Sequence, residues 1–249
     1  MSKNIYIIAG EASGDLYGSK LLAALHSIDP GLKARGWGGQ KMAAEGCVLE
    51  VRYEDASFMG FAEVILNLRK ILGLFKLTKK SILADKPDAL ILIDYPGFNL
   101  RMAEWAKKQN IKVYFYIAPQ AWAWKENRVI QLRKYVDKLF VILPFEKEFF
   151  HNHGISAYYF GHPLMHHIRE FKADPEFRKK NKLDERPIIA LLPGSRRQEI
   201  MTMLKVFLEG LENFREYQVV IGGLEHHRQL YQDIIQNSQV PCKVIYQDT

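Results

Sequence analysis

Cysteine is scarce in this sequence: its 249 residues include only Cys47 and Cys242, far apart and outside any C-x-x-C spacing. Such a pair favours neither a disulfide framework nor a zinc site, and it fits a reducing compartment. An uninterrupted apolar run of about 18 residues is also lacking, so a membrane-spanning helix is not expected. The first apolar run ends at Gly10, too early for the core of a signal peptide, which predicts a cytoplasmic protein.

The composition is that of a folded chain, with 48% hydrophobic and 25% charged residues. Its length suits one large domain or two of ordinary size. The net charge of +7 favours acidic partners, namely nucleic acid, phosphorylated small molecules or an anionic membrane surface. The basic residues are dispersed and match no nucleic-acid recognition pattern, so no nucleic-acid partner is expected.

Apolar runs of strand length alternate with helical patterns along the chain. This alternation predicts an α/β protein with parallel sheets and helices on both faces. We expect strands at residues 5–9, 89–93, 113–117, 139–143, 188–192, 219–221 and 244–246.

A charged stretch between Glu170 and Pro187 interrupts this rhythm, and we place a domain boundary there. The first domain is expected over residues 1–170 and the second over residues 187–249. The second domain has only three strand candidates, about half of what a full doubly wound domain needs, so it is expected to be small or incomplete.

The loop after the first expected strand reads AGEASGD and opens a helix. Its glycines lack the G-x-G-x-x-G spacing of dinucleotide binders, and the loop lacks the lysine of a P-loop. Ser13 or Asp15 could simply cap the helix. Because open α/β proteins bind ligands at this edge of the sheet, we favour a ligand site here. Its candidate residues are Gly10, Ser13, Gly14 and Asp15.

The stretch IDYPGFNLR ends a buried strand with Asp94 and continues to Asn99, a candidate for substrate binding. Burial can raise the pKa of a carboxyl group at such a position, which suits a general base. The alternative is a structural aspartate that caps the following helix. The position at the carboxyl end of a strand favours the functional interpretation slightly.

The stretch YIAPQAWAWKENRV places Gln120, Trp122 and Trp124 behind another expected strand. Tryptophan side chains are usually buried with the indole N–H bonded, so packing under a loop is one interpretation. The same residues beside Arg128 suit the wall of a polar ligand cleft. Both interpretations remain open.

The stretch LLPGSRRQEI predicts a strand, a Pro-Gly turn and a helix that begins near Ser195. Amide N–H groups, the helix dipole and the side chains of Arg196 and Arg197 together favour a phosphate or diphosphate site. The alternative is that Ser195 is an N-cap and the arginines form a solvated face.

The segment from residue 58 to residue 80 has apolar residues at helical spacing. This spacing predicts a core-facing stripe through Phe61, Val64, Leu68, Ile71 or Leu72, and Phe75. The surplus of apolar residues beside cations resembles an interfacial membrane helix, although a doubly buried helix is the alternative. The candidate membrane residues are Phe61, Ile65, Leu66, Leu68, Arg69, Lys70 and Leu72.

The stretch GHPLMHH carries His162 and two further histidines. No Cys or carboxylate pattern accompanies them, and Pro163 disfavours a regular helix, so we expect no metal site. A hinge or cleft role is favoured for His162.

Several of these stretches, in their order along the chain, resemble the lipid-A-disaccharide synthases, which are membrane-associated glycosyltransferases. The resemblance lies in AGEASGD, GWGG, FMGFAEV, IDYPGFNLR, PQAWAWKENRV, LPFEKEFF, GHPL and LLPGSRRQEI. It implies a GT-B fold of two Rossmann-like domains, with the acceptor on the first and the nucleotide-sugar on the second. The implied reaction is an inverting transfer from UDP-2,3-diacylglucosamine to 2,3-diacylglucosamine 1-phosphate, with release of UDP.

The resemblance also implies roles for residues. Asp94 would be the catalytic base, with Gln120 and Trp122 on the acceptor side. Ser195 and Arg196 would hold the diphosphate, with Arg197 and Glu199 as weaker candidates. No metal or cofactor is implied, because arginine and the helix dipole can neutralise the leaving group. Segment 58–80 would attach the enzyme to an anionic membrane surface, the cytoplasmic face of the inner membrane, and a homo-oligomer stays open.

Family members continue with a Gly/Ser/Thr-rich segment, a glutamate and closing helices that this sequence does not match. We therefore expect a fragment of a transferase. The alternatives are another UDP-sugar GT-B enzyme or an epimerase, or a noncatalytic membrane-binding module.

Overall fold

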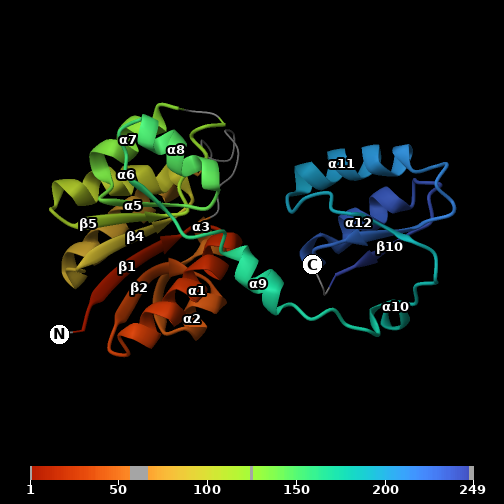
Figure 1. Ribbon diagram of the computed structural model, residues 1–249, viewed down its shortest axis with the longest axis horizontal. Helices are drawn as coiled ribbons and strands as arrows, with labels where there is room; N and C mark the ends of the chain where they lie inside the picture. Colours follow the sequence, from red (N-terminus) through yellow and green to blue (C-terminus); the bar gives the residue numbers. More distant parts are fainter. Residues whose placement is uncertain (1, 57–66, 124–125, 247–249) are drawn as a thin grey trace. The chain divides into compact units, whose positions relative to one another are not determined.

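The computed structural model describes residues 2–56, 67–123 and 126–246 (Figure 1). The chain divides into two compact units, residues 1–170 and residues 171–249, here named unit 1 and unit 2. Each unit is described by itself.

Unit 1 alternates strands and helices along most of its length. Its elements in chain order are β1 (Asn4–Ala9), α1 (Ala12–Ile28), β2 (Lys33–Gly38), α2 (Gln40–Ala44), β3 (Cys47–Arg52), α3 (Tyr53–Ala56), α5 (Leu68–Asp85), β4 (Ala89–Ile93), α6 (Pro96–Lys108), β5 (Lys112–Tyr116), α7 (Arg128–Tyr135), β6 (Lys138–Val141), α8 (Pro144–Asn152), β7 (Ala157–Tyr159) and α9 (Leu164–Glu170).

The strands of unit 1 form one parallel sheet in the order β3-β2-β1-β4-β5-β6-β7. The chain builds outward from β1 to β3 and then from β4 to β7, so the topology switches direction between β1 and β4. Strands β1 and β4 are almost wholly buried, as expected for central strands covered on both faces. Open sheets of this kind bind ligands beyond the carboxyl ends of the strands at the switch.

Helices cover both faces of this sheet (Figure 1). Helices α5, α6, α7 and α8 lie on one face, where their apolar residues pack with Tyr6, Ile8 and Phe115. Helices α1 and α2 lie on the other, against Ile5 and Ile7. The alternation of buried residues along β1 follows the period of two of a strand.

Three strands of unit 1, β2, β3 and β7, were missed by the sequence patterns. In β2 the backbone of Gly36 has a φ of +143°, and a Cβ there would lie 1.9 Å from the carbonyl oxygen of Ile7. The pairing of β2 with β3 also shifts register after Gly36. Glycine and a bulge break the run of β-branched residues by which a strand is recognised.

Unit 2 contains α10 (Phe177–Lys180), β8 (Ile188–Leu191), α11 (Arg197–Gly210), β9 (Gln218–Gly222), the 3-10 helix η1 (Glu225–His227), α12 (Arg228–Ile235) and β10 (Cys242–Ile245). Its strands form a parallel sheet in the order β10-β9-β8. Helices α11 and α12 pack together on one face of it, through Leu204, Leu208, Tyr231 and Ile234.

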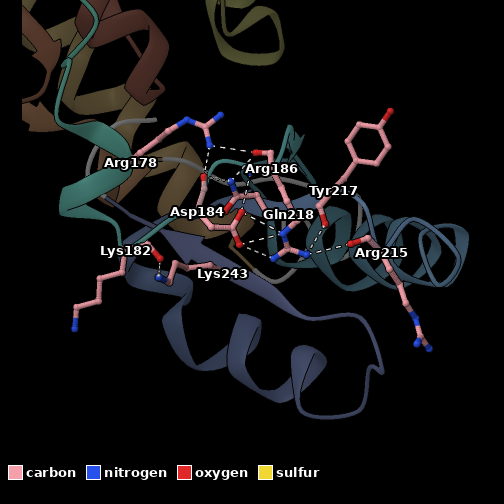
Figure 2. A network of polar contacts seen from close by, with 8 residues as sticks. All are labelled: Arg178, Lys182, Asp184, Arg186, Arg215, Tyr217, Gln218 and Lys243. Carbon is pink, nitrogen blue, oxygen red and sulfur yellow. Dashed lines mark hydrogen bonds and ion pairs between the residues drawn. The ribbon is translucent and has the colours of Figure 1, made fainter.

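A polar network joins the chain before β8 to the amino edge of this sheet (Figure 2). Gln218 donates from Nε2 to the carbonyl oxygens of Asp184 and Arg186, each at 2.8 Å, and its Oε1 accepts from the amide of Asp184. The guanidinium of Arg186 pairs with the Asp184 carboxylate and reaches the carbonyl of Arg215. These contacts place the charged stretch, where the sequence predicts the boundary, within unit 2.

Candidate functional site

The carboxyl end of β4 carries an unusual turn. Asp94 and Tyr95 both have left-handed backbones, with φ of +45° and +47°. Two successive non-glycine residues in this region are strained, and such strain often accompanies functional sites. The amide of Asp94 donates to the carbonyl of Tyr116 on β5 at 3.2 Å. Because Tyr95 is the N-cap of α6, Asp94 is not the helix cap that the sequence left open.

The side chain of Asn99 supports this turn through hydrogen bonds to backbone carbonyls. Its side chain is fully buried, and Nδ2 donates to the carbonyl oxygens of Asp94 at 2.7 Å, Ile93 at 3.3 Å and Ile8 at 3.4 Å. The amide thus joins the ends of β1 and β4 at the topological switch. We predicted contact with substrate for Asn99, and the structure places it in a supporting position.

Gly10 lets Tyr95 occupy its position against the loop after β1. A Cβ at Gly10 would lie 2.4 Å from the ring of Tyr95. The hydroxyl of Tyr95 donates to the carbonyl of Ala56 at 2.7 Å. Gly14 allows a similar approach, since a Cβ there would lie 3.1 Å from the Cβ of Ala9. Both glycines therefore make room for a neighbouring side chain at the switch.

Asp94 lies near the phenol of Tyr17 and the guanidinium of Arg128. Burial raises the pKa of Tyr17, and the negative charge of Asp94 raises it further. Burial lowers the pKa of Arg128, while Asp94 acts in the opposite direction. Tyr17 therefore stays a protonated donor beside the half-buried carboxylate, and Arg128 supplies positive charge.

Tyr17 connects this group to two other aromatic residues. The ring of His162 meets the ring of Tyr17 edge-on, with centroids 6.4 Å apart. Burial raises the pKa of Tyr116, and the electrostatic interaction with Tyr17 raises it further. Nδ1 of His162 accepts from the amide of Leu164, the first residue of α9, at 3.1 Å. Sequence reasoning missed Tyr17, although it lies one helical turn after Gly14 on α1 and thus on the same face.

Asp15 is buried and joins two helices. Its Oδ1 accepts from the amides of Gly39 at 2.7 Å and Met42 at 3.0 Å, and Oδ2 accepts from the amide of Lys41 at 3.2 Å. It therefore caps α2 rather than its own helix, whose N-cap is Glu11. Ser13 is exposed in the first turn of α1, so neither residue is the cap of α1 that the sequence suggested.

The loop after β5 is held by a buried carboxylate. Trp122 is 40% exposed, and its ring meets Phe145 edge-on at 4.9 Å. Its indole N–H donates to Oε1 of Glu146 at 3.1 Å. Gln120 is exposed in the same loop. Trp122 is therefore partly packed against α8 and partly exposed to solvent. Trp124 lies outside the described residues.

Helix α5 buries one face and exposes the other. Phe75, Thr78 and Ile82 are buried, while Leu68 and Leu72 are 49% and 57% exposed. The predicted core stripe is therefore wrong at Leu68, and Ile71 takes the partly buried position in place of Leu72.

Cations flank the exposed leucines of α5. Arg69 and Lys70 are exposed beside them, and no acidic residue occurs from residue 68 to residue 84. Of the candidate membrane residues, Phe61, Ile65 and Leu66 lie outside the described residues, as does Val64 of the predicted stripe. Within the part of the chain that the structure describes, no helix is long and apolar enough to cross a membrane.

In unit 2, a carboxylate occupies the N-terminus of α11. Oε2 of Glu199 accepts from the amides of Ser195 and Arg196, both at 3.2 Å, and Oε1 accepts from Nη1 of Arg196 at 2.9 Å. Gly194, at a φ of +107°, makes room for it, since a Cβ there would lie 2.6 Å from Oε2. Arg196 is the N-cap, so Ser195 is not. Arg197 begins the helix and is exposed.

The 3-10 helix η1 brings His227 to the backbone of Ser195. Burial lowers the pKa of His227, and the neighbouring His226 and Arg197 lower it further. The backbone of Ser195 acts in the opposite direction, so the net shift is a modest preference for the neutral imidazole. Over the described residues, no cluster of three or more His, Cys, Asp or Glu could hold a metal ion.

Comparison with known proteins identifies relatives over most of the chain. Residues 5–240 match the family model of lipid-A-disaccharide synthetases. The lipid-A-disaccharide synthase of Trichlorobacter lovleyi is 42% identical over 224 residues, which is 90% of this chain and 58% of that protein. The synthase of Coxiella burnetii (strain Dugway 5J108-111) is 37% identical over 84% of this chain and 56% of its own length. The chain thus spans a little over half the length of these relatives.

Solved structures share the architecture at low sequence identity. The UDP-GlcNAc 2-epimerase of Neisseria meningitidis bound to UDP-GlcNAc matches with a TM-score of 0.67 and 13% identity, over 98% of this chain and 72% of its own. The co-structure of S. aureus MnaA with UDP matches with a TM-score of 0.64 and 11% identity, over 98% and 69%. At this identity the likeness concerns the fold alone. With the two parallel sheets, it confirms the predicted GT-B-like α/β fold class.

Proposed function

The chain belongs to the lipid-A-disaccharide synthetase family, and from this premise we propose that it serves an inverting glycosyl transfer in lipid A biosynthesis. The donor is UDP-2,3-diacylglucosamine and the acceptor is 2,3-diacylglucosamine 1-phosphate. The observation that carries the proposal is the family match together with Asp94, a carboxylate held in a strained turn at the topological switch of unit 1.

Asp94 acts as the base that removes the proton from the acceptor hydroxyl. A general base needs a fixed carboxylate within reach of the substrate. The carbonyl of Asp94 is held by Asn99 and its amide by Tyr116, which fixes the backbone from which the side chain projects. Arg128 stabilises the ionised carboxylate of Asp94, and the protonated hydroxyl of Tyr17 lies near the same carboxylate.

Unit 2 receives the diphosphate of the donor. Arg196 and the amides at the start of α11 can neutralise the negative charge of the leaving group. Glu199 already accepts hydrogen bonds from two of these amides and from Arg196. A diphosphate that uses the same donors must therefore displace the Glu199 carboxylate. A diphosphate that leaves Glu199 in place would bind beside this carboxylate, through Arg197.

The exposed leucines and cations of α5 attach unit 1 to an anionic membrane surface, where the acylated substrates reside. Apolar side chains enter the boundary of the lipid layer, and Arg69 and Lys70 attract the headgroups. We propose the cytoplasmic face of the inner membrane as the site of this peripheral attachment. An epimerase shares the fold, but UDP-GlcNAc carries only an acetyl group and no fatty-acyl chain, so such a surface would serve no purpose in an enzyme for that substrate.

Release of UDP by this chain tests the proposal. The assay contains both acylated glucosamine substrates in detergent and compares the wild type with Asp94→Asn. Loss of the base should lower release by about 10² to 10⁴. Asp88→Asn, at the amino edge of the sheet, is the matched control and should release UDP as the wild type does.

Binding of the acceptor tests unit 1 separately, because the chain spans a little over half the length of its relatives. Acceptor in detergent should shift the NMR resonances of Asp94, Tyr17 and Arg128. UDP release that is unchanged in Asp94→Asn would contradict the role of Asp94. Absence of both release and acceptor-dependent shifts would contradict the proposed function.

A further inference from the structure

The loop between β5 and α7, residues 117–127, leads from the end of a central strand to Arg128, the cation beside Asp94. Helix α8 contacts this loop at two points. At the start of α8, Glu146 accepts from the indole of Trp122 at 3.1 Å. At its end, Nε2 of His153, the C-cap of α8, lies 3.0 Å from Oε1 of Glu126.

Both ring nitrogens of His153 face acceptors. Nδ1 lies 2.7 Å from the carbonyl oxygen of Phe149, and Nε2 faces the carboxylate of Glu126. A carbonyl oxygen and an ionised carboxylate can only accept hydrogen bonds, whereas a neutral imidazole has one donor. Both contacts are hydrogen bonds at the same time only when both nitrogens carry a proton, so the geometry favours an imidazolium.

Two further features favour the positive charge. His153 lies at the C-terminus of α8, where the helix dipole stabilises cations. Its ring also lies 4.5 Å from the ring of Phe149, measured between centroids, and aromatic faces attract cations. The charged groups that face His153 are Glu126, which favours protonation, and Arg133 of α7, which opposes it.

We propose that His153 is a positioning residue: as an imidazolium it holds Glu126, and with it the first turn of α7, against the end of α8. The carbonyl of Glu126 accepts from the amide of Val129 at 2.9 Å, so the position of Glu126 is passed directly to that turn. Loss of one proton from His153 removes one of its two hydrogen bonds. The neutral ring either releases Glu126 or holds it without the bond to the Phe149 carbonyl and without the ionic attraction, so the clamp weakens in both tautomers. The position of Arg128 beside Asp94 then depends on pH.

The pKa of His153 agrees with this arrangement. The contact with the Phe149 carbonyl raises it, and the hydrogen bond and charge of Glu126 raise it further. A raised pKa means that the clamp is fully formed below the ordinary value of about 6.5 and is lost as pH rises through the pKa of the folded protein.

NMR of the 249-residue chain labelled with ¹⁵N-histidine tests the clamp. We expect both nitrogens of His153 to be protonated at pH 6, with a titration midpoint above about 6.5. The backbone amide resonance of Arg128 should titrate with the same midpoint. Glu126→Gln should lower the midpoint of His153 by roughly half a pH unit.

Three variants separate the clamp from general effects. His153→Gln should hold the Arg128 resonance near its high-pH position at every pH, and His153→Lys, which keeps the charge, near its low-pH position. His151→Gln, an exposed histidine of the same helix, should leave the titration of Arg128 unchanged. A His153 with one protonated nitrogen at pH 6, or an Arg128 resonance that ignores His153, would overturn the proposal.

The effect of the clamp on turnover rests on the proposed function, because Arg128 acts there through Asp94. The NMR measurements need no substrate. A failed clamp with intact UDP release would leave the transferase proposal standing, and an intact clamp without acceptor binding would leave the clamp standing.

Discussion

The indole N–H of Trp122 donates a hydrogen bond of 3.1 Å to Glu146, whose carboxylate is fully buried. The other carboxylate oxygen accepts from the amides of Ile142 and Leu143, at 3.1 Å and 2.9 Å. One buried charge therefore fixes the loop after β5, the end of β6 and the start of α8 in a single arrangement. Buried carboxylates are tolerated only when their oxygens are bonded in this way.

Removing the Glu146 carboxylate should be costly. Glu146→Ala leaves an indole N–H and two amides without their acceptor and opens a cavity, so we expect a loss of about 3 kcal/mol in the free energy of unfolding. Trp122→Phe removes one donor of the three and should cost about 1 kcal/mol. Urea unfolding followed by circular dichroism measures both. Equal costs for the two variants would show that the backbone amides contribute little.

Asp15→Ala should destabilise unit 1 without any substrate present. Its carboxylate accepts from three amides of the Gly39–Met42 turn, and we expect a loss of about 2 to 3 kcal/mol. Ser13→Ala, two residues away and exposed, should stay within about 0.5 kcal/mol of the wild type. Thermal unfolding of both variants in parallel is the measurement. A stable Asp15→Ala variant that has lost acceptor binding would instead assign Asp15 to the substrate.

The Glu199 carboxylate should make unit 2 sensitive to acid. Partial burial acts to raise its pKa, but the hydrogen bonds and charge of Arg196 and the amide of Ser195 outweigh this, so the pKa of Glu199 lies below its ordinary value. A depressed pKa contributes stability above the unfolded-state value, and this stability is lost as pH falls through the folded-state value.

Melting temperatures between pH 6 and pH 3 check the acid response of Glu199. The wild type should lose more stability over this range than Glu199→Gln does, because the glutamine does not titrate. Glu212→Gln, an exposed residue near the end of the helix, is the control and should follow the wild type. Parallel acid curves for the wild type and Glu199→Gln would refute the contribution of this carboxylate.

Gln218 should prove important for joining residues 184–186 to the sheet of unit 2 (Figure 2). It is almost buried, and Gln218→Ala leaves two carbonyl oxygens and one amide without their partner. We expect a loss of about 2 kcal/mol, measured by urea unfolding. In Arg215 only the carbonyl takes part, and the side chain points away (Figure 2), so Arg215→Ala is the matched control. An equal loss in both variants would show that the network adds no stability.

Sequence patterns predicted the central strands of both units well, because a strand buried on both faces is a continuous apolar run. Residues 89–93 match β4 without error. Strands β2, β3 and β7 lie at or near the edges of the sheet, where glycine and polar residues interrupt the pattern. β2 pairs with β1, β3 with β2 and β7 with β6, and no local pattern encodes such pairing.

The candidate site was predictable in its location but not in its contacts. Gly10 and Asp94 follow strands that end at one edge of the sheet, and parallel topology brings such ends together. The partners of these residues come from elsewhere in the chain. Tyr17 arrives on α1 and Arg128 on α7, both beside Asp94, and His162 follows β7 and meets Tyr17. Only packing selects which of several polar residues on each element takes part.

By itself, the sequence determined the family, the fold class and the turns at Gly10 and Gly194. These features depend on local motifs and on the period of apolar residues. Tertiary structure alone decided what the polar side chains do. Asp15 caps a neighbouring helix, and Asn99, expected to contact substrate, instead bonds to the backbone of the Asp94 turn. Glu199 accepts from the amides that the sequence assigns to a phosphate. The physical reason is that a buried polar atom bonds to whichever donor or acceptor the fold brings within about 3 Å, however distant in the chain.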